Sequence, residues 1–257
     1  MSGAAWYDVA FDALYPDLYA QRDQAEAEQV IAWLAGQLPP SGPGALASGA
    51  WVDLACGGGR HLRALARCGT RVVGIDRSRP LLERARADSG VGAELVRGDL
   101  RRLPFGDGSF AGGLSMFTSL GYFEDDGENQ MVLAEAARVI QPGGRLLVDY
   151  LNAEWLAHDL VPRSSREAGP YRVDEVRRID RAPKRLIKEV AIFDRANGKP
   201  IKRYIESVAL WSAAELEARL LTQGFQVGAR AGDYDGGPFL ARSPRLILLA
   251  VRSERNP

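Results

Sequence analysis

Short apolar runs alternate with helix-like segments through the middle of the chain, and this alternation restricts the fold more than any other feature. We expect strands at residues 51–54, 72–75, 94–96, 112–116 and 145–150. We expect helices at 61–66, at 78–88 with Ser78 as the cap, and at 128–140, which the Pro-Gly-Gly at 142–144 should end. This order predicts an α/β fold with right-handed crossovers and a mostly parallel sheet covered on both faces.

The two ends of the chain follow other patterns. Residues 25–38 have helical character, and a Pro- and Gly-rich loop at 38–44 separates them from the first strand. Beyond Asn152, β-prone and charge-rich runs between about 170 and 210 surround an Asn-Gly hairpin signal and predict an antiparallel insertion. A capping box at 212–215 should open a helix to Gln223, and two strands are expected at 225–229 and 245–251.

The composition excludes several classes of protein. The 33 basic and 33 acidic side chains of the 257-residue chain cancel, so the broad positive field of a duplex-binding protein is missing, although a local basic patch stays compatible with this balance. Cys56 and Cys68 are the only cysteines and form no CxxC pair, so we expect neither a disulfide framework nor a metal centre. Neither a signal peptide nor a run of about 18 apolar residues is visible, so we expect a cytoplasmic protein that does not span a membrane.

The sequence DLACGGG at positions 53–59 lies between the first strand and the next helix. Glycines there let the backbone bend sharply and let a ligand approach without meeting a Cβ atom. The N-terminus of the following helix offers free N–H groups and a partial positive charge, which favour a carboxylate or a phosphate.

Carboxylates at the ends of the next two strands extend this site. Asp76 ends the second strand, where a carboxylate can accept hydrogen bonds from both ribose hydroxyls of a nucleoside. Asp99 follows the third strand, where it can accept a hydrogen bond from an adenine amino group while Leu100 packs near the ring. All these groups lie at the carboxyl ends of adjacent strands, which is where open α/β sheets bind ligands.

Together these motifs resemble those of the class I S-adenosylmethionine-dependent methyltransferases. Residues 53–59 resemble the first motif, D-x-(G/A)-x-G-x-G, with Ala55 in place of its first glycine. Residues 74–76 and 98–100 resemble the second and third motifs, and 133–144 the stretch before the fifth strand. The resemblance covers residues 50–152 and implies a Rossmann-like, doubly wound, seven-stranded sheet with its last strand antiparallel, and an antiparallel β insertion after the fifth strand.

The resemblance also implies how the chain is divided and what it does. Residues 1–152 would form lid helices and the cofactor-binding core, 153–210 an insertion that covers the substrate, and 211–257 the rest of the sheet. S-adenosylmethionine would donate a methyl group by in-line displacement to nitrogen or oxygen of a small molecule, leaving S-adenosylhomocysteine; such a donor is already activated, so the protein chiefly supplies alignment. The implied cofactor-binding residues are Tyr19, Arg22, Asp53, Ala55, Cys56, Gly57, Gly59, Asp76, Arg77, Asp99, Leu100, Met116 and Phe117.

Aromatic residues mark the expected substrate face. Phe117 and Tyr122 follow the fourth strand and could face the cationic donor, or they could simply pack beneath the loop. The aromatic N-terminal part resembles the lid helices of small-molecule N-methyltransferases, including glycine N-methyltransferases and sugar-amine dimethyltransferases. In that comparison Tyr19 and Arg22 meet the methionine portion, with Arg22 facing its carboxylate. The alternative is an amphipathic helix packed on the sheet.

The candidate catalytic residues are Tyr122, Asp149 and Tyr150. Asp149 or Tyr150, at the end of the fifth strand, could face the cleft and orient a nucleophile, or could be a structural strand end. His61 could be a base or a helix-start residue. The mixed charges of the insertion predict a solvated face, with capture of an acidic substrate as the alternative, and the loop at 232–239 is expected to close the pocket.

The glycine turn also occurs in proteins with other functions. A dinucleotide oxidoreductase requires a third glycine at the position that Leu62 occupies. A non-catalytic S-adenosylmethionine-binding protein and a protein or nucleic-acid methyltransferase stay open as alternatives. We expect a monomer or a homodimer.

Overall fold

The computed structural model describes residues 5–20, 22–38, 46, 48–88 and 93–254. Apart from Leu38, the loop expected at 38–44 lies outside the described residues. No helix in the described ranges is both long and apolar enough to cross a membrane.

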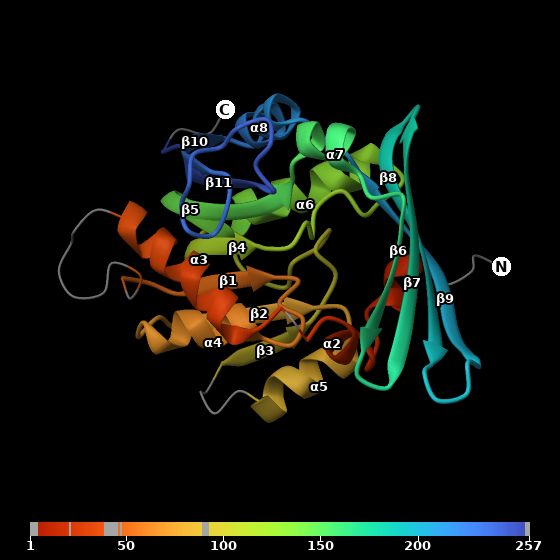
Figure 1. Cartoon of the computed structure of the whole chain (residues 1–257). Helices are drawn as coiled ribbons and strands as arrows, with labels where there is room; N and C mark the ends of the chain where they lie inside the picture. Colours follow the sequence, from red (N-terminus) through yellow and green to blue (C-terminus); the bar gives the residue numbers. More distant parts are fainter. Residues whose placement is uncertain (1–4, 21, 39–45, 47, 89–92, 255–257) are drawn as a thin grey trace.

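A seven-stranded sheet forms the centre of the molecule and confirms the expected fold class (Figure 1). Its strands are β1 (Trp51–Leu54), β2 (Val72–Asp76), β3 (Glu94–Arg97), β4 (Phe110–Ser115), β5 (Ile140–Leu151), β10 (Phe225–Ala231) and β11 (Arg245–Arg252). They lie in the order β10-β11-β5-β4-β1-β2-β3. The last strand, β11, is antiparallel to both of its neighbours, whereas the pairs among β1 to β5 are parallel.

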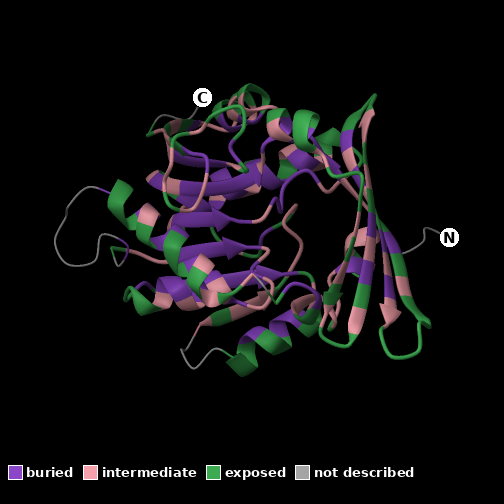
Figure 2. Ribbon diagram, viewed as in Figure 1, coloured by how far each residue is buried: buried purple, intermediate pink, exposed green. Residues whose placement is uncertain are grey.

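Helices cover both faces of this sheet. They are α1 (Trp6–Ala10), α2 (Tyr15–Leu18), α3 (Gln24–Gln37), α4 (Arg60–Arg67), α5 (Arg79–Asp88), α6 (Asp126–Val139), α7 (Ala153–Asp159) and α8 (Ala213–Thr222). Residues of α6 and α8 share one buried cluster with one face of the sheet, and residues of α3, α4 and α5 share another with the opposite face. The central strands are therefore buried along most of their length (Figure 2).

Side-chain caps fix several helix starts. Ser78 Oγ accepts a hydrogen bond from the Leu81 amide at the start of α5, as its sequence position predicts. The capping box of Ser212 and Glu215 is present at α8. The cap of α5 matters for the site because Ser78 itself lines it.

The junction between α6 and β5 differs from the expectation. Helix α6 ends at Val139, and the next residue already pairs with Phe110 of β4, so the Pro-Gly-Gly at 142–144 lies inside the strand. Gly143 has a φ of +75°, and pairing with β4 resumes at Arg145. The strand therefore begins at Ile140, before the expected start at Arg145, and contains a bulge that Pro and Gly tolerate.

The insertion is a second, four-stranded antiparallel sheet: β6 (Arg163–Ala168), β7 (Tyr171–Arg181), β8 (Lys184–Asp194) and β9 (Pro200–Ala209). The predicted Asn-Gly turn lies between β8 and β9, where Gly198 has a φ of +71°. The insertion stands beside the end of the main sheet toward which β1 and β2 point (Figure 1). Its inner side packs on the aromatic residues of α1 and α2, so the N-terminal helices lie between the two sheets.

Candidate functional site

A cavity of about 1060 Å³ opens at the carboxyl ends of β1 to β4. The core contributes the turn after β1 and the ends of β2, β3 and β4, and we call this side the wall. The described residues between Tyr7 and Gln24 form the other side, and we call them the roof. The volume is at the upper end of the range of about 300–1,000 Å³ for small-molecule sites, so the cavity can hold a cofactor together with part of a substrate.

The glycine turn lines the wall with Ala55, Cys56, Gly57 and Gly58, whereas Gly59, which was also expected at the cofactor, does not line the cavity. Ala55, Gly57 and Gly59 have φ values of +63°, +53° and +78°, which only glycine adopts without strain. A Cβ atom added at Gly58 would meet no atom within 4 Å, and Gly58 lines the cavity. The turn therefore has no side chain at Gly57 and Gly58, where its backbone lines the cavity.

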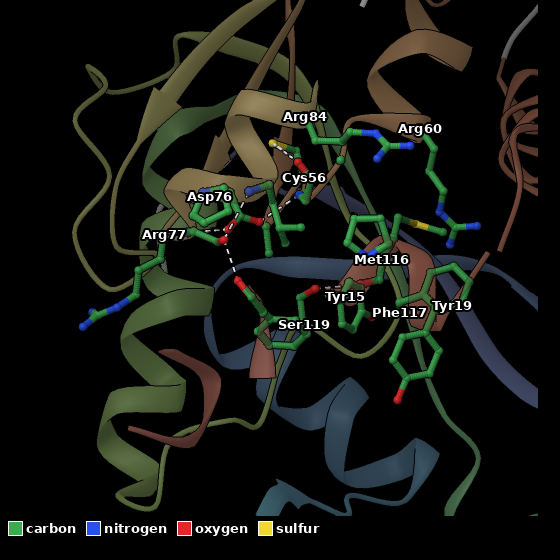
Figure 3. Close-up of a pocket in the computed structure, with 18 of the residues that line it drawn as sticks. Tyr15, Tyr19, Cys56, Arg60, Asp76, Arg77, Arg84, Met116, Phe117 and Ser119 are labelled. Carbon is green, nitrogen blue, oxygen red and sulfur yellow. Dashed lines mark hydrogen bonds between the residues drawn. The ribbon is translucent and has the colours of Figure 1, made fainter. Parts of the chain in front are cut away.

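Asp76 lies beside this turn, at one end of the cavity in Figure 3. Its Oδ2 accepts a hydrogen bond from the Gly57 amide at 2.8 Å, and its Oδ1 accepts one from the Ser78 amide at 2.8 Å. Burial raises the pKa of Asp76, against the effect of these backbone hydrogen bonds. Since each carboxylate oxygen has two lone pairs, one acceptor position on each oxygen is left for a ligand such as a diol.

Asp99 has a different environment. Its two oxygens accept hydrogen bonds from the Arg101 amide at 2.9 Å, from the Arg101 guanidinium at 3.0 and 2.6 Å, and from Arg77 Nη1 at 3.0 Å. The hydrogen bonds from Arg101 lower the pKa of Asp99. An adenine amino group would therefore have to replace one of these donors.

Asp53 lies beneath the turn and does not line the cavity. It is 1% exposed, and its Oδ2 has no hydrogen-bond partner among the described residues. Burial and the nearby charge of Asp76 raise the pKa of Asp53 to about 7. An unsatisfied, buried carboxylate close to a cavity favours a cationic ligand there.

The other end of the cavity holds Met116, Phe117 and Tyr122, with Arg22 from the roof (Figure 3 shows Met116 and Phe117). The Arg22 guanidinium carbon lies 4.5 Å from the centre of the Tyr19 ring and 4.6 Å from that of Phe117. Arg22 Nη1 donates a hydrogen bond to the Tyr15 hydroxyl at 2.7 Å. Among the described residues Arg22 has no carboxylate partner, so its charge is available to an anionic group of a ligand.

The roof is an aromatic assembly. Phe11 stacks on Tyr122 with the ring centres 5.8 Å apart, and Trp6 meets the edge of Tyr122 at 4.8 Å. Burial raises the pKa of Tyr122 well above its ordinary value, so its hydroxyl stays protonated at neutral pH. The aromatic N-terminal part thus covers the cavity and does not pack on the main sheet as an amphipathic helix.

Behind the roof, the inner side of the insertion carries buried charges. Lys188 Nζ is 2.6 Å from Glu206 Oε2 and donates a hydrogen bond to the Tyr19 hydroxyl at 3.2 Å. The Glu175 side chain is 4% exposed and pairs with Arg177. The expectation of a solvated face is therefore wrong for this side of the insertion, because β strands alternate and every second residue points toward the roof.

Asp149 and Tyr150 do not face the cavity, contrary to the expectation. Adjacent residues of a strand point to opposite faces, and both side chains are fully buried. The Tyr150 hydroxyl donates a hydrogen bond to the Ala209 carbonyl, and its ring stacks on Trp211 at 5.5 Å. Asp149 contacts Arg245, Tyr234 and the Phe117 amide. The loop at 232–239 also does not line the cavity; its Asp235 instead accepts a hydrogen bond from Gln29 of α3.

Twelve of the sequence-predicted site residues line the cavity: Tyr19, Arg22, Ala55, Cys56, Gly57, Asp76, Arg77, Asp99, Leu100, Met116, Phe117 and Tyr122. Sequence reasoning missed Arg60, whose guanidinium carbon lies 4.0 Å from the centre of the Phe117 ring, and Ser119. Buried His61 also lines the cavity, but burial and two neighbouring arginines lower its pKa well below the usual value, so it is a poor base. The position of Arg60 directly after the glycine turn could have indicated its role.

Known proteins match this chain over the same regions. Residues 52–144 match the family model described as a methyltransferase domain. The chain is 30% identical to a cypemycin N-terminal methyltransferase from a Streptomyces species, over 87% of this chain and 89% of the relative. It is 27% identical to dTDP-3-amino-3,4,6-trideoxy-alpha-D-glucopyranose N,N-dimethyltransferase from Streptomyces venezuelae, over 90% and 95%. In three dimensions it is similar to the CcbJ methyltransferase from Streptomyces caelestis, with a TM-score of 0.78, 19% identity and coverage of 96% and 99%.

Proposed function

Since this chain belongs to the class I S-adenosylmethionine-dependent methyltransferases, we propose that it methylates a small molecule, and that the acceptor atom is an amine nitrogen. The family and the cofactor expected from the motifs are thereby confirmed. The names of both curated relatives specify an amino terminus or an N,N-dimethylation, which supports nitrogen over oxygen.

The two ends of the cavity carry the proposal. At one end Asp76 has two acceptor positions left, which suit the ribose hydroxyls, and at the other Arg22 has a positive charge without a described carboxylate partner, which suits the carboxylate of the amino-acid portion. The glycine turn lines the same cavity and has no side chain at Gly57 and Gly58. Asp53, with its orphaned oxygen beneath the turn, favours the positive charge of the ligand.

When bound, S-adenosylmethionine supplies a methyl group on a positively charged sulfur, already activated for displacement. The protein therefore has to align the acceptor and exclude water. Tyr122, Phe11 and Tyr15 provide aromatic surfaces that suit an amine, and the protonated Tyr122 hydroxyl can orient it but cannot remove its proton. An aligned amine nitrogen would form the new bond to the methyl carbon with its lone pair while the carbon–sulfur bond breaks and S-adenosylhomocysteine leaves. The resulting ammonium group would then lose its proton to solvent.

We propose the insertion, within 153–210, as the cover of the acceptor site. Its buried charges hold Tyr19 from behind, and its apolar residues pack on the roof. In this division the core of 1–152 holds the cofactor and 211–257 completes the sheet.

A transfer assay with labelled S-adenosylmethionine tests the proposal. Small primary and secondary amines, including amino sugars and short peptides with a free amino end, are compared with analogues carrying hydroxyl in place of amine. We expect label in amines only, and none with the variant Gly58→Leu, whose side chain fills the cavity. Label in the hydroxyl analogues alone would contradict nitrogen as the acceptor atom. Methyl transfer by the Gly58→Leu variant would contradict the cavity as the site of the reaction.

A further inference from the structure

Two consecutive residues shortly after β4 have a strained backbone, and the first of them, Phe117, lines the cavity. Phe117 and Thr118 have φ values of +54° and +59°, in the left-handed region that glycine favours. Each such residue costs about 1–2 kcal/mol, and a β-branched threonine is especially rare there. The Thr118 hydroxyl is buried and has no described hydrogen-bond partner, so the threonine side chain gives no compensation.

One buried residue holds both strained positions. The Phe117 amide donates a hydrogen bond to Asp149 Oδ2 at 3.0 Å, and the Thr118 amide donates one to the Asp149 carbonyl at 2.9 Å. Strained backbone persists only where surrounding contacts over-determine it. The side chain and main chain of Asp149 supply such contacts from the neighbouring strand.

Asp149 is itself held from two further elements. Arg245 Nε of β11 donates a hydrogen bond to Asp149 Oδ1 at 2.6 Å, and the Tyr234 hydroxyl donates one to Oδ2 at 2.6 Å. Asp149 is fully buried, and its charge is balanced by Arg245. Stability alone does not account for this arrangement, because burying an ion pair costs about as much free energy as the pair returns.

The strained turn carries a ring that supports two cations of the cavity. The Arg22 and Arg60 guanidinium carbons lie 4.6 and 4.0 Å from the centre of the Phe117 ring, and that of Arg245 lies at 5.2 Å. Arg60 is paired with Glu26, whereas Arg22 is the group that the proposed function assigns to the cofactor carboxylate. The Phe117 ring therefore supports Arg22 from the wall, while the Tyr19 ring and the Tyr15 hydroxyl hold it from the roof.

We propose that Asp149, with Arg245 and Tyr234, is a positioning residue: it holds the strained Phe117–Thr118 turn so that the Phe117 ring presents Arg22 to the carboxylate of the cofactor. This inference rests on the proposed function. It gives the contacts among Asp149, Arg245 and Tyr234 a role at one end of the ligand only, because the proposed function assigns the nucleoside end to Asp76 and the glycine turn.

Two ligands that differ in that end test the inference. S-adenosylhomocysteine carries the amino-acid portion, and 5′-methylthioadenosine lacks it. Dissociation constants of both are measured by calorimetry for the native protein, Arg22→Gln, Phe117→Leu, Asp149→Asn and Tyr234→Phe. Asn152→Ala is the matched control, because Asn152 is buried near the same strand end and binds the carbonyls of Leu240, Ala241 and Ser243 but not the turn.

We expect Asp149→Asn, Phe117→Leu and Arg22→Gln each to weaken S-adenosylhomocysteine about 10-fold or more, and methylthioadenosine less than about 3-fold. Tyr234→Phe leaves Asp149 paired with Arg245, so we expect it to weaken S-adenosylhomocysteine about 3-fold with less effect on methylthioadenosine. If Asp149→Asn does not fold, Tyr234→Phe and Phe117→Leu together test the positioning role. Asn152→Ala should change neither constant.

The failures are distinguishable. If the native protein binds neither ligand, the proposed function is wrong. If Arg22→Gln weakens both ligands equally, the carboxylate role of Arg22 is wrong. If Arg22→Gln is selective but the Asp149, Phe117 and Tyr234 variants are not, the positioning role is overturned and Asp149 is only structural.

Discussion

The wall and the roof of the cavity are built in different ways. The wall takes its groups from short segments that directly follow strands, such as the glycine turn and Asp76, and its key contact joins residues 19 positions apart. The roof is held from distant parts of the chain: Tyr19 by Lys188, 169 positions away, and Asp8 by Arg77, 69 positions away. The geometry of the wall depends on local backbone and therefore leaves a recognisable motif in the sequence. The geometry of the roof depends on contacts between distant side chains and leaves none.

The comparison predicts that single changes in the wall have larger effects than single changes in the roof. The largest effect is expected for Gly58→Leu. Its side chain would enter the cavity, so we expect S-adenosylhomocysteine to bind about 100-fold more weakly or not at all, as calorimetry would measure. Gly36→Leu in α3 is the matched control, because Gly36 also has open space around it but does not line the cavity. Native affinity in the Gly58 variant would place the ligand elsewhere.

The buried carboxylate beneath the wall should make stability depend on pH. Burial and the charge of Asp76 raise the pKa of Asp53 to about 7, so the folded state holds a proton that the unfolded state releases near pH 4. This contribution to stability is full at low pH and is lost as the pH rises toward 7, by up to about 1.4 kcal/mol per pH unit. Urea unfolding between pH 5 and 8 should show this loss for the native protein and a flatter profile for Asp53→Asn. Equal slopes of unfolding free energy against pH in the two proteins would show that folding does not raise the pKa of Asp53.

A change in the roof should have a smaller effect. Asp8→Asn removes the carboxylate that meets the Arg77 guanidinium at 2.6 and 3.2 Å, but Arg77 keeps Asp99. The pair is partly exposed, so we expect a loss of about 0.5 kcal/mol in unfolding free energy and less than about a threefold change in S-adenosylhomocysteine affinity. Asp17→Asn changes the same charge elsewhere in the roof and serves as the control. A tenfold loss of affinity in Asp8→Asn alone would contradict this expectation and mean that the pair of Asp8 and Arg77 contributes to binding about as much as Arg22 does.

The smallest effect concerns Ala55. Glycine adopts its φ of +63° without strain, but glycine also makes the unfolded chain more flexible. We expect Ala55→Gly to raise the unfolding free energy by about 0.5 kcal/mol, because about 1–2 kcal/mol of strain exceeds the entropic loss. Ala66→Gly within α4 should lower it by about 1 kcal/mol. A loss of stability in Ala55→Gly would argue that the alanine side chain packs usefully.

The sequence was informative wherever periodicity and turn chemistry determine the structure. The main sheet, the insertion and the wall residues from Ala55 to Leu100 follow from strand patterns, caps and glycines. The direction of Asp149 and Tyr150 could not be derived, because the burial of the fifth strand on both faces hides the alternation that would separate them. Similarly, Asp99 accepts four hydrogen bonds, three from Arg101 and one from Arg77. Nothing in the sequence spacing indicates that both arginine side chains turn toward Asp99.

The buried charges of the insertion were missed for a related reason. Their mixed signs are typical of a solvated surface, and only the packing of α1 and α2 against one side of the sheet encloses Glu175 and Lys188. Burial of a strand face depends on what covers it, which is a property of the whole fold.

The central claim is that the cavity binds a nucleoside through Asp76 at the tip of β2. Calorimetric titration with S-adenosylhomocysteine of the native protein and of Asp76→Ala, both shown to be folded by circular dichroism, tests it most directly. We predict one site in the native protein and affinity about 100-fold weaker in the variant, because two hydrogen bonds to a charged group are lost. No binding by the native protein, or equal binding by both, would contradict the claim.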